Sequence, residues 1–246
     1  MRMTAPKFAL LAFAMAALLF APRSQAGVTR VSFLSGGKKI AVDRYSPVGT
    51  STSHAILVLH GAGGTLLDGP EMRRKADSLA VAGNTVYLVH YFNRTGTLVA
   101  VDSTMQQHFE AWLQTVRDAV TRAGTDSKTR SVGIYGYSLG AFLAVAAASN
   151  NPRVGAVVEQ AGGVWNSQEE RIGRMPPVLT VHGREDRRVP FAKYAEPLAR
   201  LLRGRHSLAG TLYLPNEGHV FTAPANAEVS AKAAPFFAQH LGTAGH

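Results

Sequence analysis

The strongest constraint on the fold of this chain is a regular alternation of short apolar runs with longer helix-favouring segments. Strands buried on both faces of a sheet are typically rich in Val, Ile and Leu, and such runs occupy residues 55–59, 85–89, 130–135, 154–160, 177–182 and 211–214. Helices are expected at about 70–82, 103–123, 139–150, 190–203 and 226–240. Strands that alternate with helices predict an α/β fold with a mostly parallel central sheet and helices on both faces.

Two further strand-like runs precede this alternation. Residues 28–33 and 39–45 flank the turn sequence Leu34-Ser35-Gly36-Gly37-Lys38, so they predict an antiparallel hairpin at the edge of the sheet. The chain has no internal repeat and no low-complexity linker. Residues 27–246 are long enough to bury one substantial core, and we expect a single domain there.

The first 26 residues predict a secretory signal peptide. Arg2 and Lys7 precede the apolar stretch 8–20, and Ser24-Gln25-Ala26 supplies a small residue before Gly27. The apolar stretch is short for a membrane span, although an uncleaved membrane anchor is the alternative. The chain has no cysteine and therefore no site for a lipoprotein anchor. We expect export to the periplasm or beyond, with cleavage after Ala26.

The charge balance is basic. The chain carries 26 Lys and Arg residues against 16 Asp and Glu residues, a formal net charge of +10 at pH 7. Such a balance is compatible with nucleic acid or an anionic surface as a partner. The basic residues are scattered, however, with no long run and little aromatic interleaving, so no nucleic-acid partner is expected. Because no disulfide can form without cysteine, stability must come from packing.

The pentapeptide Gly136-Tyr137-Ser138-Leu139-Gly140 matches the pattern G-x-S-x-G of a nucleophile elbow. An apolar run precedes it and an Ala-rich segment follows it, so Ser138 is expected on a tight turn between a strand and a helix. The serine hydroxyl then projects from the sheet, and the flanking glycines avoid collisions with the backbone. The alternative is a glycine-rich turn whose serine only caps the helix, because so short a motif also occurs by chance.

A second glycine-rich turn follows the run 55–59. The sequence His60-Gly61-Ala62-Gly63-Gly64 can present backbone N–H groups to a developing oxyanion. A plain strand-to-helix turn is the alternative. A phosphate-binding loop fits poorly, because no Gly-Lys-Ser/Thr follows and the glycine spacing is not G-x-G-x-x-G.

Asp186 is the candidate carboxylate partner of a catalytic imidazole. It lies in the loop after the strand 177–182, in the pattern His182-Gly183-x-x-Asp186. A carboxylate there can orient an imidazole, or it can cap the helix that follows Pro190. Glu159, near the end of the preceding strand, is the rival acid.

His219 is the candidate catalytic base. It follows the last strand directly, whereas the other histidines after Asp186 lie behind a helix, within the final helix and at the terminus: His206, His240 and His246. The order Ser138, Asp186, His219, with each residue on a loop after a strand, is the order of the α/β-hydrolase arrangement.

Several motifs of the chain together resemble those of a known family. The segments Leu59-His60-Gly61, Gly136-Tyr137-Ser138-Leu139-Gly140, His182-Gly183-x-x-Asp186-x-x-Val189-Pro190 and Gly218-His219-x-Phe221 resemble the α/β-hydrolase superfamily. The short, uninterrupted layout of residues 50–240 is most similar to its dienelactone hydrolase branch. The resemblance implies the α/β-hydrolase fold without a large cap domain. Dienelactone hydrolases proper use a cysteine nucleophile, so the resemblance is to serine members of the branch.

The resemblance also suggests roles for residues around the nucleophile. Backbone N–H groups of Ala62 and Leu139 are expected to form the oxyanion hole. Tyr91 and Arg94 approximate a Tyr-then-Arg segment that helps to bind a substrate carboxylate in the branch, with one extra residue between them here. A solvated surface arginine is the alternative for Arg94.

The segment between the strands ending at Gln160 and starting near Pro177 is too short for a full lid. Trp165 in this segment either roofs the pocket or plugs a local core. Tyr137, beside the nucleophile, is a further candidate substrate contact. Without a lid or an apolar trough, we expect a preference for small, soluble acyl groups.

Together these features predict an exported serine hydrolase, with a carboxylesterase of small soluble esters or lactones as the favoured activity. Ser138 is the nucleophile, His219 the general base and Asp186 the group that orients it. No metal or organic cofactor is implied. An acyltransferase or a peptidase using the same residues is one alternative, and a non-catalytic binding protein of the same fold is another.

Overall fold

The computed structural model describes residues 25–126, 129, 131–165 and 169–242. Most of the predicted signal peptide therefore lies outside the described residues. Ala26, its expected last residue, is buried, and its backbone N–H donates a hydrogen bond to Asp77 Oδ1 at 2.9 Å. Within the described ranges, no helix is long and apolar enough to cross a membrane.

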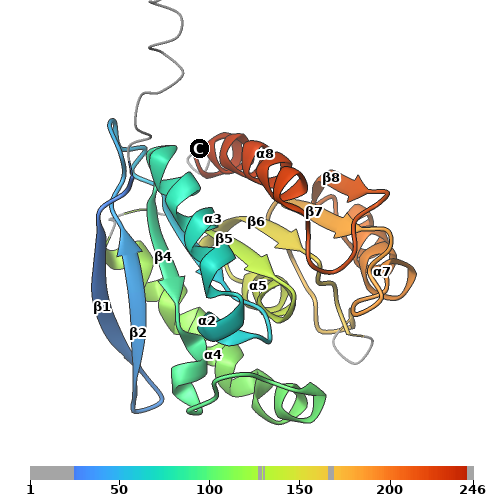
Figure 1. The fold of residues 1–246 in the computed structure, drawn as a ribbon, viewed down its shortest axis with the longest axis horizontal. Helices are drawn as coiled ribbons and strands as arrows, with labels where there is room; N and C mark the ends of the chain where they lie inside the picture. The colour runs from blue at the N-terminus through green and yellow to red at the C-terminus, as the bar shows by residue number, and fades with distance from the viewer. Residues whose placement is uncertain (1–24, 127–128, 130, 166–168, 243–246) are drawn as a thin grey trace, which may run out of the picture.

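An eight-stranded sheet forms the centre of the molecule (Figure 1). Its spatial order is β1-β2-β4-β3-β5-β6-β7-β8. The strands are β1 (Val28–Ser35), β2 (Lys38–Tyr45), β3 (Ala55–Leu59), β4 (Thr85–Val89), β5 (Val132–Tyr137), β6 (Val154–Gln160), β7 (Val178–Gly183) and β8 (Leu208–Leu214). The hairpin β1–β2 is antiparallel and lies at the edge, β2 pairs antiparallel with β4, and the strands β3 to β8 pair in parallel. The predicted α/β fold and edge hairpin are confirmed.

Helices cover both faces of this sheet, as predicted (Figure 1). The apolar sides of α4 (Asp102–Asp126), α5 (Leu139–Ala148) and α7 (Phe191–Gly204) join the buried cluster on one face. Those of α3 (Gly69–Val81) and α8 (Ala223–Leu241) join the cluster on the other face. The predicted helices and strands agree with the observed ones to within about three residues at most ends.

Two short elements were not predicted from the sequence. Helix α2 (Gly64–Leu67) follows the loop after β3, and the 3-10 helix η1 (Tyr91–Arg94) follows β4. Each has only four residues, which is too short for hydrophobic periodicity to reveal. Gly64 opens α2 at φ +62°, where a Cβ would also collide with the carbonyl of Leu98, so this position requires glycine.

Candidate active site

The parallel strands place their following loops at one edge of the sheet. Strands β3 to β8 run in the same direction, so the segments after their carboxyl ends lie together. The glycine-rich loop, the G-x-S-x-G turn and the loops of Asp186 and His219 all belong to this set. The sheet topology alone thus brings together residues that are far apart in the sequence.

Ser138 occupies a strained turn between β5 and α5, as the motif predicted. Its backbone has φ 54° and ψ −121°, a left-handed conformation that costs a residue other than glycine on the order of 1–3 kcal/mol. A Cβ on Gly136 would collide with the carbonyl of Gly140, and a Cβ on Gly140 would collide with the carbonyls of Leu59 and His60. Both flanking glycines are therefore required for α5 to start this close to the sheet.

The side chains of Ser138, His219 and Asp186 form one hydrogen-bonded chain. Ser138 Oγ lies 2.9 Å from His219 Nε2, and His219 Nδ1 lies 2.8 Å from Asp186 Oδ2. Asp186 Oδ1 accepts the backbone N–H groups of Arg188 at 2.9 Å and Val189 at 2.7 Å. These bonds fix the carboxylate, so that one oxygen is left to face the imidazole.

The electrostatic surroundings keep Asp186 ionised. Burial raises the pKa of Asp186, but hydrogen bonds from His182, His219 and the Val189 N–H outweigh burial and hold its pKa well below the usual range. His182 Nε2 lies 2.8 Å from the Val189 carbonyl and 3.4 Å from Asp186 Oδ2. His182 thus contacts the Asp186 carboxylate and stabilises its ionised form, a role that the sequence pattern did not reveal.

Glu159, the rival acid, makes no contact with His219 in the described part of the chain. Its Oε1 accepts the Gly162 backbone N–H at 2.6 Å, and its side chain is fully buried. Burial raises the pKa of Glu159 to about 7. Of the two candidates, the geometry places Asp186 and not Glu159 beside the imidazole.

The loop after β3 passes directly against the nucleophile. A Cβ on Gly61 would lie 3.0 Å from Ser138 Cβ, and Ala62 lines the same pocket as Ser138 and Leu139. Leu139 is the first residue of α5, so its backbone N–H lies at a helix N-terminus, which favours negative charge. The two predicted oxyanion donors thus flank Ser138.

Asp68 braces this loop and was missed from the sequence. It precedes Gly69-Pro70 at the start of α3, where an aspartate normally caps the helix, but its side chain makes no capping bond. Instead Asp68 Oδ2 accepts the Gly63 N–H at 3.0 Å. Burial raises the pKa of Asp68, while the backbone N–H groups of Gly63 and Gly61 act in the opposite direction.

This strand order, elbow and hydrogen-bonded chain are typical of one group of hydrolases. The model of the dienelactone hydrolase family matches residues 41–240. The chain belongs to the dienelactone hydrolase family. The sequence has no significant match among curated proteins.

Solved structures share the fold of this dienelactone hydrolase family member. A dienelactone hydrolase from Anabaena variabilis is 20% identical, with a TM-score of 0.63 over 89% of this chain and 100% of that chain. A dienelactone hydrolase-like promiscuous phosphotriesterase from metagenomic libraries is 18% identical, with a TM-score of 0.72 over 89% and 100%. A cold-adapted esterase from an Arctic intertidal metagenomic library is 16% identical, with a TM-score of 0.67 over 86% and 93%. At these identities the likeness shows the fold alone.

The structure does not bring two predicted substrate contacts, Tyr91 and Arg94, to the pocket of this family member, because both side chains are bonded elsewhere. The Tyr91 ring is fully buried and stacks on His60 at 4.1 Å, and its hydroxyl donates to the His60 carbonyl at 2.7 Å. Arg94 donates to the Gly36 carbonyl at 2.6 Å, in the turn of the β1–β2 hairpin. Tyr91 therefore supports the loop after β3, and Arg94 ties η1 to the edge hairpin.

Tyr137 also acts on the machinery rather than on the pocket described below. Its hydroxyl donates to the His219 carbonyl at 3.2 Å, and the two rings lie 5.5 Å apart. Tyr137 is absent from the residues that line the pocket. It holds the loop that carries the imidazole, which is a positioning role.

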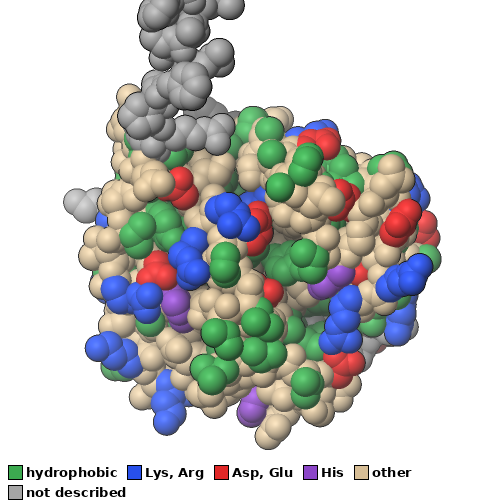
Figure 2. All heavy atoms as spheres, in the orientation of Figure 1, with side chains coloured by type: hydrophobic (Ala, Val, Ile, Leu, Met, Phe, Trp, Pro, Cys, Tyr) green, Lys and Arg blue, Asp and Glu red, His purple; other side chains and the backbone are tan. Residues whose placement is uncertain are grey.

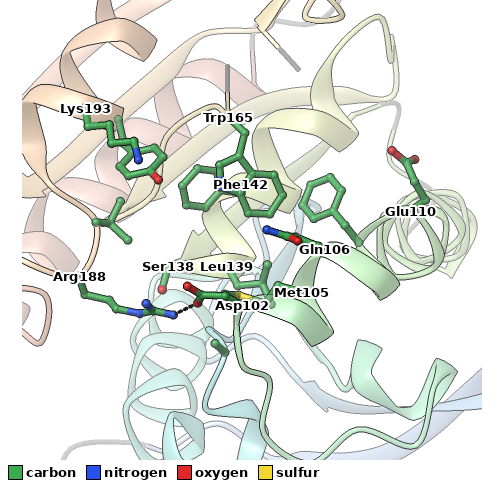
Figure 3. A pocket seen from close by; sticks show the side chains of 14 residues that line it. Asp102, Met105, Gln106, Glu110, Ser138, Leu139, Phe142, Trp165, Arg188 and Lys193 are labelled. Atoms are coloured by element: carbon green, nitrogen blue, oxygen red, sulfur yellow. Dashed lines mark hydrogen bonds and ion pairs between the residues drawn. The ribbon is translucent and has the colours of Figure 1, made fainter. Parts of the chain in front are cut away.

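A pocket of about 650 Å³ opens beside Ser138 (Figure 3). Its apolar wall consists mainly of aromatic and aliphatic side chains from α4, α5, α7 and the segments after β6 and β7: Met105, Phe109, Leu139, Phe142, Trp165, Val189 and Tyr194. Trp165 stacks on Phe142 at 4.8 Å and meets Phe109 edge-on at 4.7 Å. Trp165 thus lines the pocket, as expected. The expectation that no apolar trough faces the site is wrong.

An ion pair crosses the mouth of this pocket. Arg188, two residues after Asp186, is bonded to Asp102 at the start of α4 (Figure 3). Both side chains are more than half exposed, so the pair contributes little to stability. Neither residue carried a recognisable signal in the sequence, because the pairing depends on where α4 begins in space.

Among the described residues, no cluster of three or more His, Asp and Glu side chains is arranged to hold a metal ion. The site brings together side chains and backbone N–H groups that can act in catalysis. They comprise a serine hydroxyl paired with an imidazole, a buried carboxylate behind it and two N–H groups beside it.

Proposed function

We propose that this protein is a serine carboxylesterase that works through an acyl-enzyme on Ser138. The observation that carries the proposal is the hydrogen-bonded chain from Ser138 Oγ through His219 to Asp186, with bonds of 2.9 and 2.8 Å. Membership of a hydrolase family supports it further. Intact partners at each position argue against a non-catalytic binding protein of the same fold.

The mechanism follows from the roles of the three side chains. Ser138 Oγ attacks the ester carbonyl while His219 Nε2 takes the hydroxyl proton, which it then gives to the leaving alcohol. Asp186 accepts the Nδ1 proton, so it fixes the tautomer and stabilises the imidazolium. Water next attacks the acyl-enzyme with His219 as base, which releases the acid and restores Ser138.

The backbone N–H groups of Ala62 and Leu139 stabilise the tetrahedral oxyanion in both steps. Each such donor is worth roughly 2.7–4 kcal/mol of transition-state stabilisation. Ser138 lies at the N-terminus of α5, so the negative charge develops where the helix dipole is favourable. The substrate part that enters the pocket is apolar, because rings of Phe109, Phe142 and Trp165 form its wall.

Labelling by a fluorophosphonate, combined with turnover of nitrophenyl butyrate, tests the proposal. The wild-type protein is expected to be labelled and active, and both Ser138→Ala and His219→Ala to lose turnover while remaining folded by circular dichroism. His206→Ala is the matched control, because His206 follows α7 and is expected to behave like wild type. Labelling and turnover that persist in Ser138→Ala would refute the serine mechanism.

Export is a separate proposal, and it is supported by the sequence of residues 1–26. The mature amino terminus is expected at Gly27 in protein recovered from the periplasm or the medium of a bacterial host. Amino-terminal sequencing tests this. A terminus that retains Ala26 would contradict the cleavage position, and it would keep the buried contacts of Ala26 and its hydrogen bond to Asp77.

A further inference from the structure

The exposed hydrophobic side chains of this protein are unevenly distributed. Nine large hydrophobic side chains are exposed among the described residues, and six of them lie in three short segments: Leu66 and Leu67, Leu98, Val99 and Val101, and Val220. We call these six residues the apolar rim. The other three, Val28, Leu34 and Val81, lie in the edge hairpin and at the end of α3.

The segments of the apolar rim adjoin loops of the candidate active site. Leu66 and Leu67 belong to α2, which begins directly after the oxyanion loop. Val220 is the residue after His219, whose imidazole lies 2.9 Å from Ser138 Oγ. In Figure 2 hydrophobic side chains gather over α2 and the loop beside it.

The rim segments on the oxyanion side are packed together. The Ala100 N–H donates to the Ala62 carbonyl at 2.8 Å, so the segment containing Leu98 is anchored to the oxyanion loop. The rim also continues into the pocket. The Met105 N–H donates to the Val101 carbonyl at 2.9 Å, and Met105 forms part of the pocket wall.

Scattered apolar residues on a surface need no explanation, but an apolar group beside a catalytic opening marks an interaction site. Exposed fractions of 65% for Leu66, 74% for Leu98 and 79% for Val220 mean that these side chains project outward. These side chains come from three separate segments, so an extended surface can contact more of them than a small substrate held beside Ser138.

The positive net charge of the protein favours an anionic surface over a neutral one. Residues 27–246, which remain after removal of the predicted signal peptide, carry a formal net charge of +7, and exposed Arg187 follows Asp186 at the same edge of the sheet. Cationic proteins that also present aliphatic side chains bind anionic lipid interfaces through both terms. We propose that the apolar rim docks this protein on an anionic lipid surface, with the pocket mouth facing that surface. Delivery of an ester from the surface rests on the proposed function, whereas docking does not.

Cosedimentation with vesicles tests the docking. The inactive Ser138→Ala protein, with its signal peptide removed, is mixed with vesicles of equal parts phosphatidylglycerol and phosphatidylcholine, or of phosphatidylcholine alone. Binding is expected with the anionic vesicles, weaker in high salt, and reduced at least tenfold by adding Leu66→Ser and Leu98→Ser. The matched control adds Val28→Ser and Leu34→Ser, two exposed positions in the edge hairpin, and is expected to bind like the parent.

The variant with Leu66→Ser and Leu98→Ser is called the rim variant, and the one with Val28→Ser and Leu34→Ser the control variant. The proposal would be overturned if the protein did not bind anionic vesicles or if the rim variant bound as tightly as the control variant. It would also be overturned if sedimentation velocity showed that the rim joins two copies of the chain. Thermal unfolding of the rim variant must match that of the control, so that a loss of binding is not a loss of fold.

Kinetics with the active protein separate docking from catalysis. In the Ser138 background, the rim variant is expected to hydrolyse dissolved nitrophenyl acetate at the wild-type rate and to lose at least tenfold on an ester dispersed in anionic micelles. Equal rates of both proteins on the dispersed ester would count against docking. Absence of turnover on every ester would refute the proposed function, and the vesicle experiment would still decide the docking.

Discussion

The two sides of Ser138 are built in different ways. On one side, His219 and Asp186 form a hydrogen-bonded chain, and backbone N–H groups fix the carboxylate. On the other side, aromatic rings and aliphatic side chains form much of the pocket wall, polar side chains such as Gln106 and Lys193 line the rest, and one exposed ion pair lies at the mouth. Directional bonds specify the chemistry, whereas shape and apolar area specify what enters. The two sides are therefore expected to respond differently to substitution.

The largest effect is expected on the hydrogen-bonded side. Asp186→Asn should lower kcat by about 10⁴-fold, because an amide favours the wrong imidazole tautomer. Glu159→Gln is the matched control, since Glu159 binds Gly162 and not His219. Steady-state kinetics on nitrophenyl butyrate measure both. A severe loss in Glu159→Gln with an active Asp186→Asn would reverse the assignment of the acid.

A smaller effect is expected at the oxyanion loop. Asp68→Ala should lower kcat by about 10²-fold with little change in KM, because it frees the loop that carries a donor used mainly in the transition state. Asp68→Asn should recover most of the activity, since an amide oxygen can still accept the Gly63 N–H. If Asp68→Ala instead changed KM alone, the residue would act on substrate binding.

Glu159 should make stability depend on pH. Its pKa of about 7 in the folded state lies above the ordinary value of 4.5, so between these values the folded state binds more protons than the unfolded state. Its contribution therefore favours the folded state below about pH 4.5 and is lost as the pH rises through 7. The free energy of unfolding of Glu159→Gln, relative to that of wild type, should therefore increase by on the order of 2 kcal/mol between pH 4.5 and pH 8. Urea unfolding at both pH values measures this, and a constant difference would contradict the buried titration.

The smallest effect is expected in the pocket. Trp165→Ala should reduce kcat/KM for nitrophenyl hexanoate by about tenfold, equivalent to about 1.4 kcal/mol of lost contact. Turnover of the acetate should change by less than about twofold, because a short acyl group does not reach the rings. Equal losses on both esters would mean that Trp165 supports the nucleophile helix through Phe142 instead.

The sequence was informative wherever a feature depended on local backbone. Alternating runs predicted the sheet, and glycines that no other residue can replace marked the turn at Ser138. His219 could be chosen among the later histidines because only it follows a strand. Parallel strands then necessarily brought Ser138, Asp186 and His219 to one edge.

Features that depend on side chains from distant elements were not predictable. Arg94 was expected in the site, but η1 turns its guanidinium toward Gly36 in the edge hairpin. The apolar pocket was missed because Phe109 and Phe142 lie within ordinary amphipathic or buried helices and meet Trp165 only in three dimensions. Asp68 has the sequence position of a helix cap, and only the structure shows that its carboxylate turns back to the loop.

Helix α5 has consequences for how this enzyme can change over generations. All ten of its residues are buried, half of them alanines, and the helix packs against β5, β6 and α4. A larger side chain at Ala141, Ala144 or Ala147, which are fully buried, would collide with packed neighbours and displace the helix that begins beside Ser138. We therefore expect inherited substitutions at these alanines to be lost with activity. Changes of specificity are expected at pocket-lining positions outside α5, such as Met105, Phe109 and Trp165.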